Sequence, residues 1–160
     1  DEFSKFARMP ASNPVPSDIR KIVKEAVTLY REAQKDVKFT FRDSKEVPVF
    51  NLDREQMKRV MINLLDNSIE AIDGEGEITI DLDYDRALQM VKIEFADNGK
   101  GISPENKEKL FEPYFSTKKQ GTGLGLAIVN TIITDHNGFI RVKDNKPKGV
   151  KFIIELPLRV

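Results

Sequence analysis

The chain has 160 residues, enough for one domain with a proper core and too few for two comfortable ones. Lys plus Arg and Asp plus Glu number 26 each, and the resulting zero net charge argues against a protein that binds nucleic acid over its whole surface. The absence of cysteine excludes disulfides, thiolate zinc sites and cysteine nucleophiles, and no apolar run approaches the roughly 18 residues of a membrane span.

The chain opens with a helix end, a linker and a complete helix. Residues 1–8 carry apolar side chains at helical spacing and predict the end of a helix that begins upstream. The prolines of residues 9–16 predict a linker. Ser17 is a predicted N-cap, and the apolar stripe after it predicts a helix over 17–34. The main domain is expected to occupy residues 17–160.

Two strand-like segments and a long helix come next. Residues 37–41 alternate in hydrophobicity like a strand. Residues 47–51 predict a short partner at a sheet edge, because Pro48 lacks the N–H that an interior strand needs. Asp53 is the predicted N-cap of a helix over 53–72, whose apolar residues recur on one side.

The second half of the chain alternates strand pairs with helices. Its predicted elements, in order, are strands 76–84 and 90–97, a short helix over 103–110, a helix over 124–137, and strands 139–144 and 149–158. Short loops within each strand pair are consistent with hairpins. This order favours an α+β fold: a two-layer α/β sandwich with a mixed, largely antiparallel sheet and about three main helices on one face.

Two asparagines lie four residues apart on the long helix, in the stretch NLLDNSIEA. Asn63 and Asn67 therefore project from one face of that helix. Amide oxygens are hard, neutral ligands that suit Mg²⁺, and neutrality helps when the metal already carries a polyphosphate. An amphipathic helix with asparagines on its wet face is the alternative interpretation, and it needs no ligand.

The stretch DNGKGI, residues 97–102, follows a predicted strand. Asp97 can accept a hydrogen bond from an amino group such as the exocyclic amine of adenine. Gly99 and Gly101 permit a left-handed turn and a close approach of a ligand to the backbone. A plain Asn-Gly turn accounts for the same residues without a ligand.

The stretch KKQGTGLGLAIV, residues 118–129, places three glycines before an apolar helix. Because N–H groups and the helix dipole favour anions at a helix N-terminus, this stretch predicts a phosphate contact, with a flexible connector as the alternative. A P-loop requires G-x-x-x-x-G-K-[ST], which does not occur in the sequence. A dinucleotide fingerprint requires G-x-G-x-x-G directly after a strand, whereas the spacing here is G-x-G-x-G. Both of these nucleotide-binding motifs are therefore excluded.

Taken in order, these motifs resemble the ATP-binding catalytic domain (HATPase_c) of sensor histidine kinases, in the GHKL ATPase superfamily. NLLDNSIEA is similar to the family's N box, DNGKG to its G1 box, FEPYF to its F box and GTGLGL to its G2 box. The resemblance spans residues 17–158, and its details are similar to kinases of the nitrogen-regulation (NtrY/NtrB-like) type. In that type, DEFSKFARMP resembles the end of the second dimerisation helix, so residues 1–8 are implied to belong to it. The resemblance implies a Bergerat-type ATP-binding fold.

The resemblance also implies a role for each matched position. Asn67 is implied to coordinate Mg²⁺, with Asn63 beside the phosphates and Asp97 reading adenine. Gly99 and Gly101 are implied to shape the base pocket, and residues 111–120 are implied to form a mobile lid in which Lys118 contacts phosphate. Gly121, Gly123 and Gly125 are implied to form the phosphate-side turn. The other residues implied to bind ATP are Ile102, Phe111, Thr122, Leu124 and Leu126. Catalysis is implied to rest on Asn63, Asn67 and the lid residue Lys118.

Four positions qualify this resemblance. Hydrolytic relatives carry a water-activating glutamate where this chain has Asn63, and because an amide cannot act as that base, the chain is expected to hold ATP rather than hydrolyse it. Glu70 stands where many relatives have a basic residue, so a phosphate contact is not expected there, and Val150 stands where a threonine usually follows the last glycine. His136 lacks the acid and the Asn-Pro that follow a phosphoacceptor histidine, so a structural role at a helix end is expected.

The resemblance implies a protein-histidine kinase domain that binds ATP and Mg²⁺ and donates the γ-phosphoryl group to a histidine on a separate dimerisation domain. The phosphoryl group would then pass to the aspartate of a response regulator of the nitrogen-regulator type. The parent protein is expected to be a homodimer with its kinase part in the cytoplasm, with or without an inner-membrane anchor. The fragment itself is expected to contact neither nucleic acid nor membrane. A GHKL protein serine kinase or anti-sigma factor, a hydrolase of the chaperone or topoisomerase kind, and a non-catalytic nucleotide sensor remain alternatives.

Overall fold

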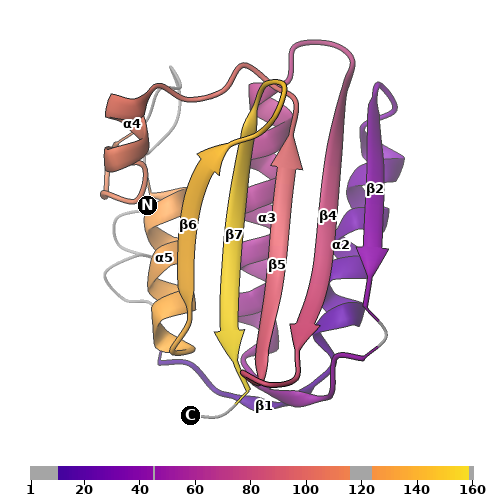
Figure 1. Cartoon of the computed structure of the whole chain (residues 1–160), viewed down its shortest axis with the longest axis vertical. Helices are drawn as coiled ribbons and strands as arrows, with labels where there is room; N and C mark the ends of the chain where they lie inside the picture. The colour runs from indigo at the N-terminus through magenta and orange to yellow at the C-terminus, as the bar shows by residue number, and fades with distance from the viewer. Residues whose placement is uncertain (1–10, 45, 116–123, 159–160) are drawn as a thin grey trace.

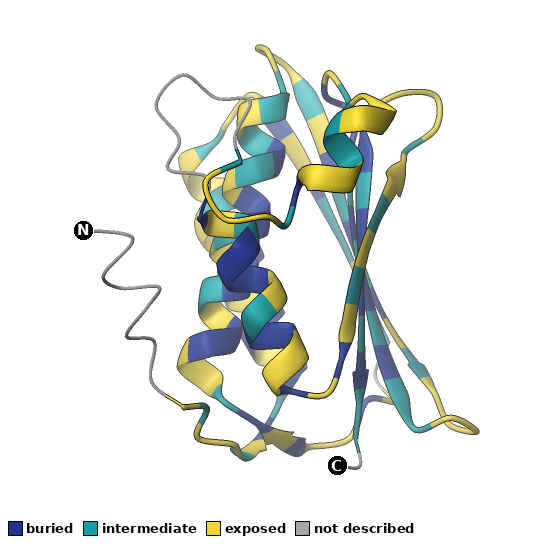
Figure 2. Ribbon diagram, turned by 90° about the vertical axis from the view of Figure 1, so that its left-hand side faces the viewer, coloured by how far each residue is buried: buried dark blue, intermediate teal, exposed yellow. Residues whose placement is uncertain are grey.

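The computed structural model describes residues 11–44, 46–115 and 124–158. They form two layers, a five-stranded sheet and a set of helices packed against one of its faces (Figure 1 and Figure 2). The main helices are α2 (Ile19–Ala33), α3 (Arg54–Ala71) and α5 (Gly125–Asp135). The predicted two-layer α+β sandwich is confirmed. None of the helices in the described part of the chain is long and apolar enough to cross a membrane.

The sheet has the strand order β2-β4-β5-β7-β6. Its strands are β2 (Val37–Asp43), β4 (Gly76–Asp85), β5 (Met90–Asp97), β6 (Phe139–Asp144) and β7 (Val150–Pro157). β2 runs parallel to β4, and the other neighbouring pairs are antiparallel. The sheet is therefore mixed and largely antiparallel, and the predicted β4–β5 and β6–β7 hairpins are both present.

Alternation along the strands sends one side of the sheet into the core. In β5, the side chains of Val91, Ile93 and Phe95 are fully buried, whereas the residues between them are half-buried on the outer face. Phe95 lies opposite Phe152 of β7, so bulky residues fill the centre of the layer. The covering side of α3 is equally apolar and has no exposed surface at Met57, Val60, Met61, Leu64 and Leu65. α3 is thereby fixed over the centre of the sheet, with most of its polar residues turned away from the core and Gln56 and Ser68 buried.

The N-terminal region differs from the prediction. β1 (Val15–Ser17) pairs antiparallel with β3 (Phe50–Leu52) in a separate two-stranded sheet, so the expected linker over 9–16 ends in a strand. The prediction that residues 47–51 are an edge partner of the preceding strand is wrong. That strand, β2, instead pairs along its whole length with β4, which offers a longer alternating segment than the Pro48 region does.

Two helices begin at the N-cap residue that the sequence indicates, and one helix begins at a different N-cap residue. Ser17 is not the N-cap of α2, because Asp18 takes that position and accepts a hydrogen bond from Arg20 N–H at 3.0 Å. Asp53 caps α3 as predicted, and Ser103 caps the short helix α4 (Pro104–Lys109). Each cap satisfies an N–H group that the first turn of its helix leaves without a partner.

His136 joins the end of α5 to the start of α3. Its ring is buried, with Nδ1 2.8 Å from the carbonyl oxygen of Ile132 and Nε2 accepting a hydrogen bond from Asp53 N–H at 3.0 Å. This pattern requires a neutral ring that carries its proton on Nδ1. The geometry agrees with the structural role expected for His136, and it engages both ring nitrogens.

Replacing His136 by Ala is expected to lower the free energy of unfolding by about 1–3 kcal/mol, because Asp53 N–H loses its acceptor in a partly buried place. Urea denaturation of the two proteins measures the difference. Thr134→Ala, at an exposed position in the same turn, is the control and is expected to change stability by less than about 0.5 kcal/mol. Equal stability of His136→Ala and the wild-type chain would contradict the proposed contact.

Candidate functional site

The C-terminal ends of α3 and β5 lie at the same end of the molecule (Figure 1). α3 and β5 both run toward the upper end of Figure 1, and the turn between β6 and β7 lies at the same end, with α4 beside it. α5 begins next to the middle of α3, where the Asn63 side chain contacts Gly125. The ends of α3 and β5, the β6–β7 turn and α4 therefore lie near one another, and the start of α5 lies further down the side of α3.

Asp97 ends β5 and is only 2 % exposed. Its Oδ1 accepts hydrogen bonds from the N–H of Gly99 at 2.9 Å and of Val150 at 3.4 Å. Burial raises the pKa of the Asp97 carboxyl, and these N–H groups and the nearby Ser68 hydroxyl oppose that shift without cancelling it. A carboxylate with a raised pKa at the end of a strand is the arrangement that binding sites often show.

The Asp97 carboxylate and the Ser68 hydroxyl lie close together at this point, and both can make further hydrogen bonds. Both backbone hydrogen bonds to the Asp97 side chain use Oδ1. The Ser68 hydroxyl, 1 % exposed on α3, makes no hydrogen bond of standard geometry within the described part of the chain. A buried hydroxyl without a hydrogen bond of standard geometry is unfavourable, so the Ser68 hydroxyl beside Asp97 fits a ligand that supplies one.

The backbone around Asp97 is packed too closely for side chains. A Cβ at Gly99 would lie 2.4 Å from the carbonyl oxygen of Ala71 in α3, and one at Gly149 would lie 1.9 Å from the carbonyl oxygen of Asp97. The predicted left-handed turn occurs at Gly101, with φ of 80°, and not at Gly99. Gly99 is required because the turn after β5 approaches the end of α3 there, whereas an added Cβ at Gly101 would make an ordinary contact with the Gly149 carbonyl oxygen at 3.8 Å.

The two asparagines of α3 have different surroundings. Asn63 donates its Nδ2 hydrogen to the carbonyl oxygen of Gly125 at 3.0 Å, which leaves its Oδ1 for another partner. Asn67, one turn further along, is half-buried and makes no hydrogen bond within the described ranges. Asn63 thus lies beside the start of α5, and Asn67 lies one turn closer to the C-terminal end of α3. Amide oxygens in these places fit a hard cation or a phosphate-bound metal.

The start of α5 supports an anion contact. Leu124 is the N-cap residue, Gly125 is the first helical residue, and no described side chain caps the first turn. The half-buried Leu126 and the buried Leu124 hold this turn against the core. Uncapped N–H groups and the helix dipole together favour a negatively charged ligand.

Further predicted residues lie around this end or outside the described ranges. Ile102 and Phe111 are half-buried and pack against the core, and the Phe111 ring meets that of Phe152 edge to face with centroids 6.4 Å apart. The predicted lid and glycine-turn residues Lys118, Gly121, Thr122 and Gly123 lie outside the described residues. Phe111 therefore connects the predicted lid to the sheet core.

Three contributors escaped the sequence-based prediction. Ser68 had no signal, because a serine on a helix is ordinary until its burial is known. Asn145 donates from Nδ2 to the carbonyl oxygen of Asp97 at 2.8 Å, and Gly149 leaves room for that carbonyl. Gly149 had one signal in the sequence, its place at the end of the loop between the last two predicted strands. Its φ of 104° in the structure explains why glycine is favoured there.

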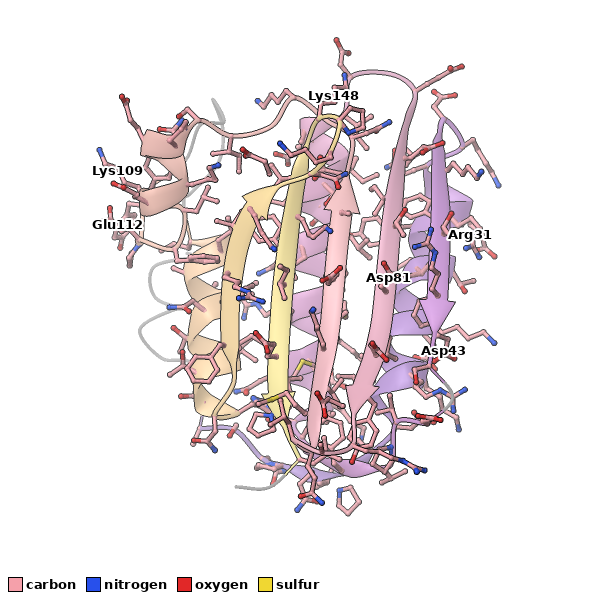
Figure 3. The ribbon with its side chains drawn as sticks, in the orientation of Figure 1. Arg31, Asp43, Asp81, Lys109, Glu112 and Lys148 are labelled. Carbon is pink, nitrogen blue, oxygen red and sulfur yellow. The ribbon has the colours of Figure 1, made fainter. Side chains whose placement is uncertain are left out.

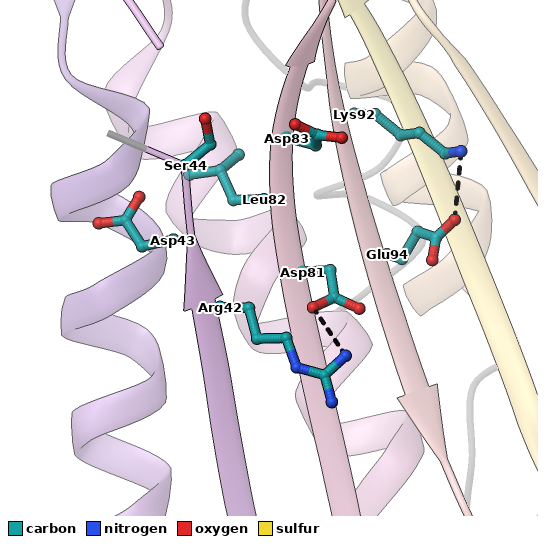
Figure 4. A pocket seen from close by; sticks show the side chains of 8 residues that line it. All are labelled: Arg42, Asp43, Ser44, Asp81, Leu82, Asp83, Lys92 and Glu94. Carbon is teal, nitrogen blue, oxygen red and sulfur yellow. Dashed lines mark ion pairs between the residues drawn. The ribbon is translucent and has the colours of Figure 1, made fainter. Parts of the chain in front are cut away.

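The outer face of the sheet holds a separate shallow depression. Its lining residues are Arg42, Asp43, Ser44, Asp81, Leu82, Asp83, Lys92 and Glu94 (Figure 4). Ion pairs cross it between Arg42 and Asp81 at 3.5 Å and between Lys92 and Glu94 at 3.3 Å. Figure 3 places Asp81 in the middle of the sheet and Lys148 at its upper end, near the β6–β7 turn. The depression is therefore distinct from the buried carboxylate site.

The sequence of the chain is similar to sensor histidine kinases. Residues 52–160 match the family model described as histidine kinase-, DNA gyrase B-, and HSP90-like ATPase. The chain is 36% identical over 164 residues to nitrogen regulation protein NtrY of Azorhizobium caulinodans, covering 99% of this chain and 21% of that protein. It is 37% identical over 160 residues to the signal transduction histidine-protein kinase AtoS of Escherichia coli (strain K12), covering 98% of this chain and 26% of that protein. The chain thus spans between a fifth and about a quarter of the length of these relatives.

Solved structures give the same family. The nucleotide-free catalytic domain of histidine kinase ThkA has a TM-score of 0.82 and 35% sequence identity, covering 91% of this chain and 96% of that domain. The mycobacterial sensor histidine kinase MprB has a TM-score of 0.78 and 27% identity, covering 91% of this chain and 97% of that one. Since the family model covers more than half of the chain and the ThkA domain matches over nearly its full length, the chain belongs to the histidine kinase-, DNA gyrase B- and HSP90-like ATPase family, as a catalytic domain of the sensor histidine kinase type.

Proposed function

We propose that this domain binds ATP with Mg²⁺ and donates the γ-phosphoryl group to a histidine on a separate dimerisation domain. The observation that carries the proposal is the buried Asp97 carboxylate, whose backbone hydrogen bonds both go to Oδ1, beside the buried Ser68 hydroxyl. Asp97 is the acceptor we assign to the exocyclic amine of adenine. Burial strengthens this hydrogen bond, because water does not compete for the carboxylate inside a protein.

The phosphates are assigned to the region between α3 and α5. Asn63 joins α3 to the start of α5, where no described side chain caps the first turn. Lys118 and the glycine turn Gly121–Gly123 belong to this region on the resemblance. Asn67 is the residue we assign to Mg²⁺, which when bound neutralises phosphate charge and polarises the γ-phosphoryl group. The protein's own contribution is positioning and charge stabilisation.

Asn63 favours transfer over hydrolysis. Its amide nitrogen donates to the Gly125 carbonyl, and an amide has no proton-accepting role at neutral pH. A water near the γ-phosphate would therefore lack a base at this position. In the proposed transfer, the bond from the γ-phosphorus to the bridging oxygen of ADP breaks, a phosphorus–nitrogen bond forms on the acceptor histidine, and its proton passes to a base on the acceptor's domain.

The acceptor histidine is assigned to another domain of the parent protein. Both ring nitrogens of His136 are engaged in the fold, and its ring is buried, so it is unsuited to accept a phosphoryl group. On the resemblance, residues 1–8 end the dimerisation helix and 9–16 link it to this domain. We place the domain in the cytoplasm, where ATP is available, within a homodimer whose phosphoryl group passes to a response regulator of the nitrogen-regulator type. The related ThkA has been solved in complex with the response regulator protein TrrA, with a TM-score of 0.83 and 29% identity to this chain, covering 98% of this chain and 45% of that one.

Gly125→Ala is expected to weaken ATP binding by about 3- to 10-fold with little change in the fold, because a methyl group would crowd the phosphate-facing turn. The space at Gly125 is open, with Asn63 Nδ2 4.0 Å from the position of the added carbon, so the substitution itself is tolerated. Gly123→Ala is expected to act in the same direction. Isothermal titration with ATP and Mg²⁺, alongside thermal unfolding, measures both effects. Normal ATP affinity in both variants would remove this stretch from the phosphate site.

Titration of the wild-type chain with ATP in the presence and absence of Mg²⁺ tests the binding part of the proposal. The wild-type chain is expected to show saturable ATP binding that is tighter with Mg²⁺ than without it. Asn67→Ala is expected to bind ATP with the same affinity whether or not Mg²⁺ is present. An absence of ATP binding would favour a non-catalytic domain. Steady release of inorganic phosphate without any acceptor would favour a hydrolase.

A further inference from the structure

The turn between β6 and β7 reaches back to the residue that ends β5. Asn145 donates from its side-chain Nδ2 to the carbonyl oxygen of Asp97 at 2.8 Å. Its own N–H donates to the carbonyl oxygen of Gly149 at 2.9 Å, which closes the turn. Asn145 is half-buried, although Lys146 and Lys148 beside it are exposed. The turn is therefore attached to β5 by a side chain as well as by the sheet.

Asn145 continues the hydrogen bonding of β5 where the sheet stops. The pairing of β5 with β7 ends at Ala96 opposite Lys151, one residue before Asp97. On the other side, Asp97 still pairs with Ile78 of β4. On the side of β5 that faces β7, the Asn145 amide thus donates the hydrogen bond to Asp97 that another paired residue of β7 would have donated. The backbone of Asp97 is held from both sides, and its side-chain direction is set by that backbone.

We propose that Asn145 is a positioning residue for base selection, which acts by holding Asp97 so that its Oδ2 is presented to the exocyclic amine of the nucleotide. The inference rests on the proposed function of Asp97. The Asp97 Oδ1 is already fixed by Gly99 and Val150, so a rotation of the Asp97 backbone would move Oδ2 away from the base while these bonds adjust. Loss of the Asn145 donor therefore affects recognition of the amine more than the rest of nucleotide binding.

The neighbouring residue provides a matched control. Asp144 pairs with Lys107 of α4 at 2.7 Å, and this hydrogen bond lowers the pKa of the Asp144 carboxyl. The ion pair is on the surface and does not touch Asp97. Asp144→Asn therefore perturbs the same turn, one residue away, while leaving the Asn145 contact in place.

The test compares ATP with purine riboside 5′-triphosphate, which has the same phosphates but lacks the exocyclic amine. In the wild-type chain, ATP is expected to bind more tightly than the analogue. In Asn145→Ala, ATP affinity is expected to fall by about 3- to 10-fold, which is the effect of one lost neutral hydrogen bond, with analogue affinity unchanged within about twofold. Asp144→Asn is expected to keep the wild-type ratio of the two affinities.

The outcomes separate this inference from the proposed function. If the wild-type chain does not bind ATP, the proposed function falls and the inference with it. If the wild-type chain prefers ATP and Asn145→Ala keeps that preference, or loses affinity for both nucleotides equally, only the role of Asn145 in base selection is overturned. Thermal unfolding checks the fold of each variant. Should Asn145→Ala not fold, Asn145→Ser, whose shorter side chain stays polar in the turn, is measured by the same ratio and judged by the same criterion.

Discussion

The Asp97→Asn variant is expected to bind ATP about 10- to 100-fold more weakly than the wild-type chain, because a hydrogen bond to a charged acceptor is lost. Asn keeps the size of the side chain and an oxygen that accepts from Gly99 N–H, so the turn after β5 is preserved. The other oxygen becomes the amide NH2 group of Asn. Two hydrogen-bond donors, this NH2 group and the amine of adenine, then face each other, and neither can accept. The measurement is isothermal titration with ATP and Mg²⁺.

A second carboxylate of the chain serves as the control for this prediction. Asp83 is exposed on the outer face of the sheet, at the depression that is distinct from the proposed site. Asp83→Asn removes the same charge from the molecule and is expected to leave ATP affinity unchanged. If Asp97→Asn also bound ATP with wild-type affinity, Asp97 would not read the base.

Gly149→Ala is expected to have the largest effect on stability, a loss of about 2–5 kcal/mol in the free energy of unfolding. The added Cβ would lie 1.9 Å from the carbonyl oxygen of Asp97 and 2.7 Å from its carbonyl carbon. The φ of 104° at Gly149 adds backbone strain for any residue with a Cβ. Relief of the clash would move the β6–β7 turn away from β5, and with it the contacts of Val150 and Asn145 to Asp97.

Gly74 separates the two causes of that loss. It also has a positive φ, 76°, but nothing lies within 4 Å of an added Cβ. Gly74→Ala therefore carries the backbone strain alone and is expected to lose about 1–2 kcal/mol. Chemical denaturation of both variants gives the comparison. Equal losses in Gly74→Ala and Gly149→Ala would show that the β6–β7 turn is not held tightly against β5.

Local signals in the sequence were sufficient for the helix and hairpin framework. Asp53 predicted the start of α3, because capping is decided by neighbouring residues, and the alternation of 76–84 and 90–97 predicted two strands with a short connection. The parallel pairing of β2 with β4 joins segments separated by the whole of α3. Such a pairing depends on how the helix packs across the sheet, and no pattern within either strand specifies it.

Parts of the candidate site carry local signals in the sequence, for a similar reason. Asp97 and the α3 asparagines stand in recognisable sequence motifs, and their roles in nucleotide binding stay predictions. Ser68 and Asn145 gain their importance only from burial and from contacts across the fold. An asparagine in a turn has an ordinary local explanation, so its bond to Asp97 could not be inferred from the turn sequence.

Phosphoryl transfer in trans tests the central claim most directly. The chain is mixed with the separately expressed dimerisation domain of its parent protein, ATP labelled at the γ-phosphate and Mg²⁺, and the label on each polypeptide is followed over time. We expect acid-labile label on a histidine of the dimerisation domain, none on His136 of this chain, and loss of the signal in Asp97→Asn. Label on His136, or release of inorganic phosphate at the same rate without the dimerisation domain, would contradict the account.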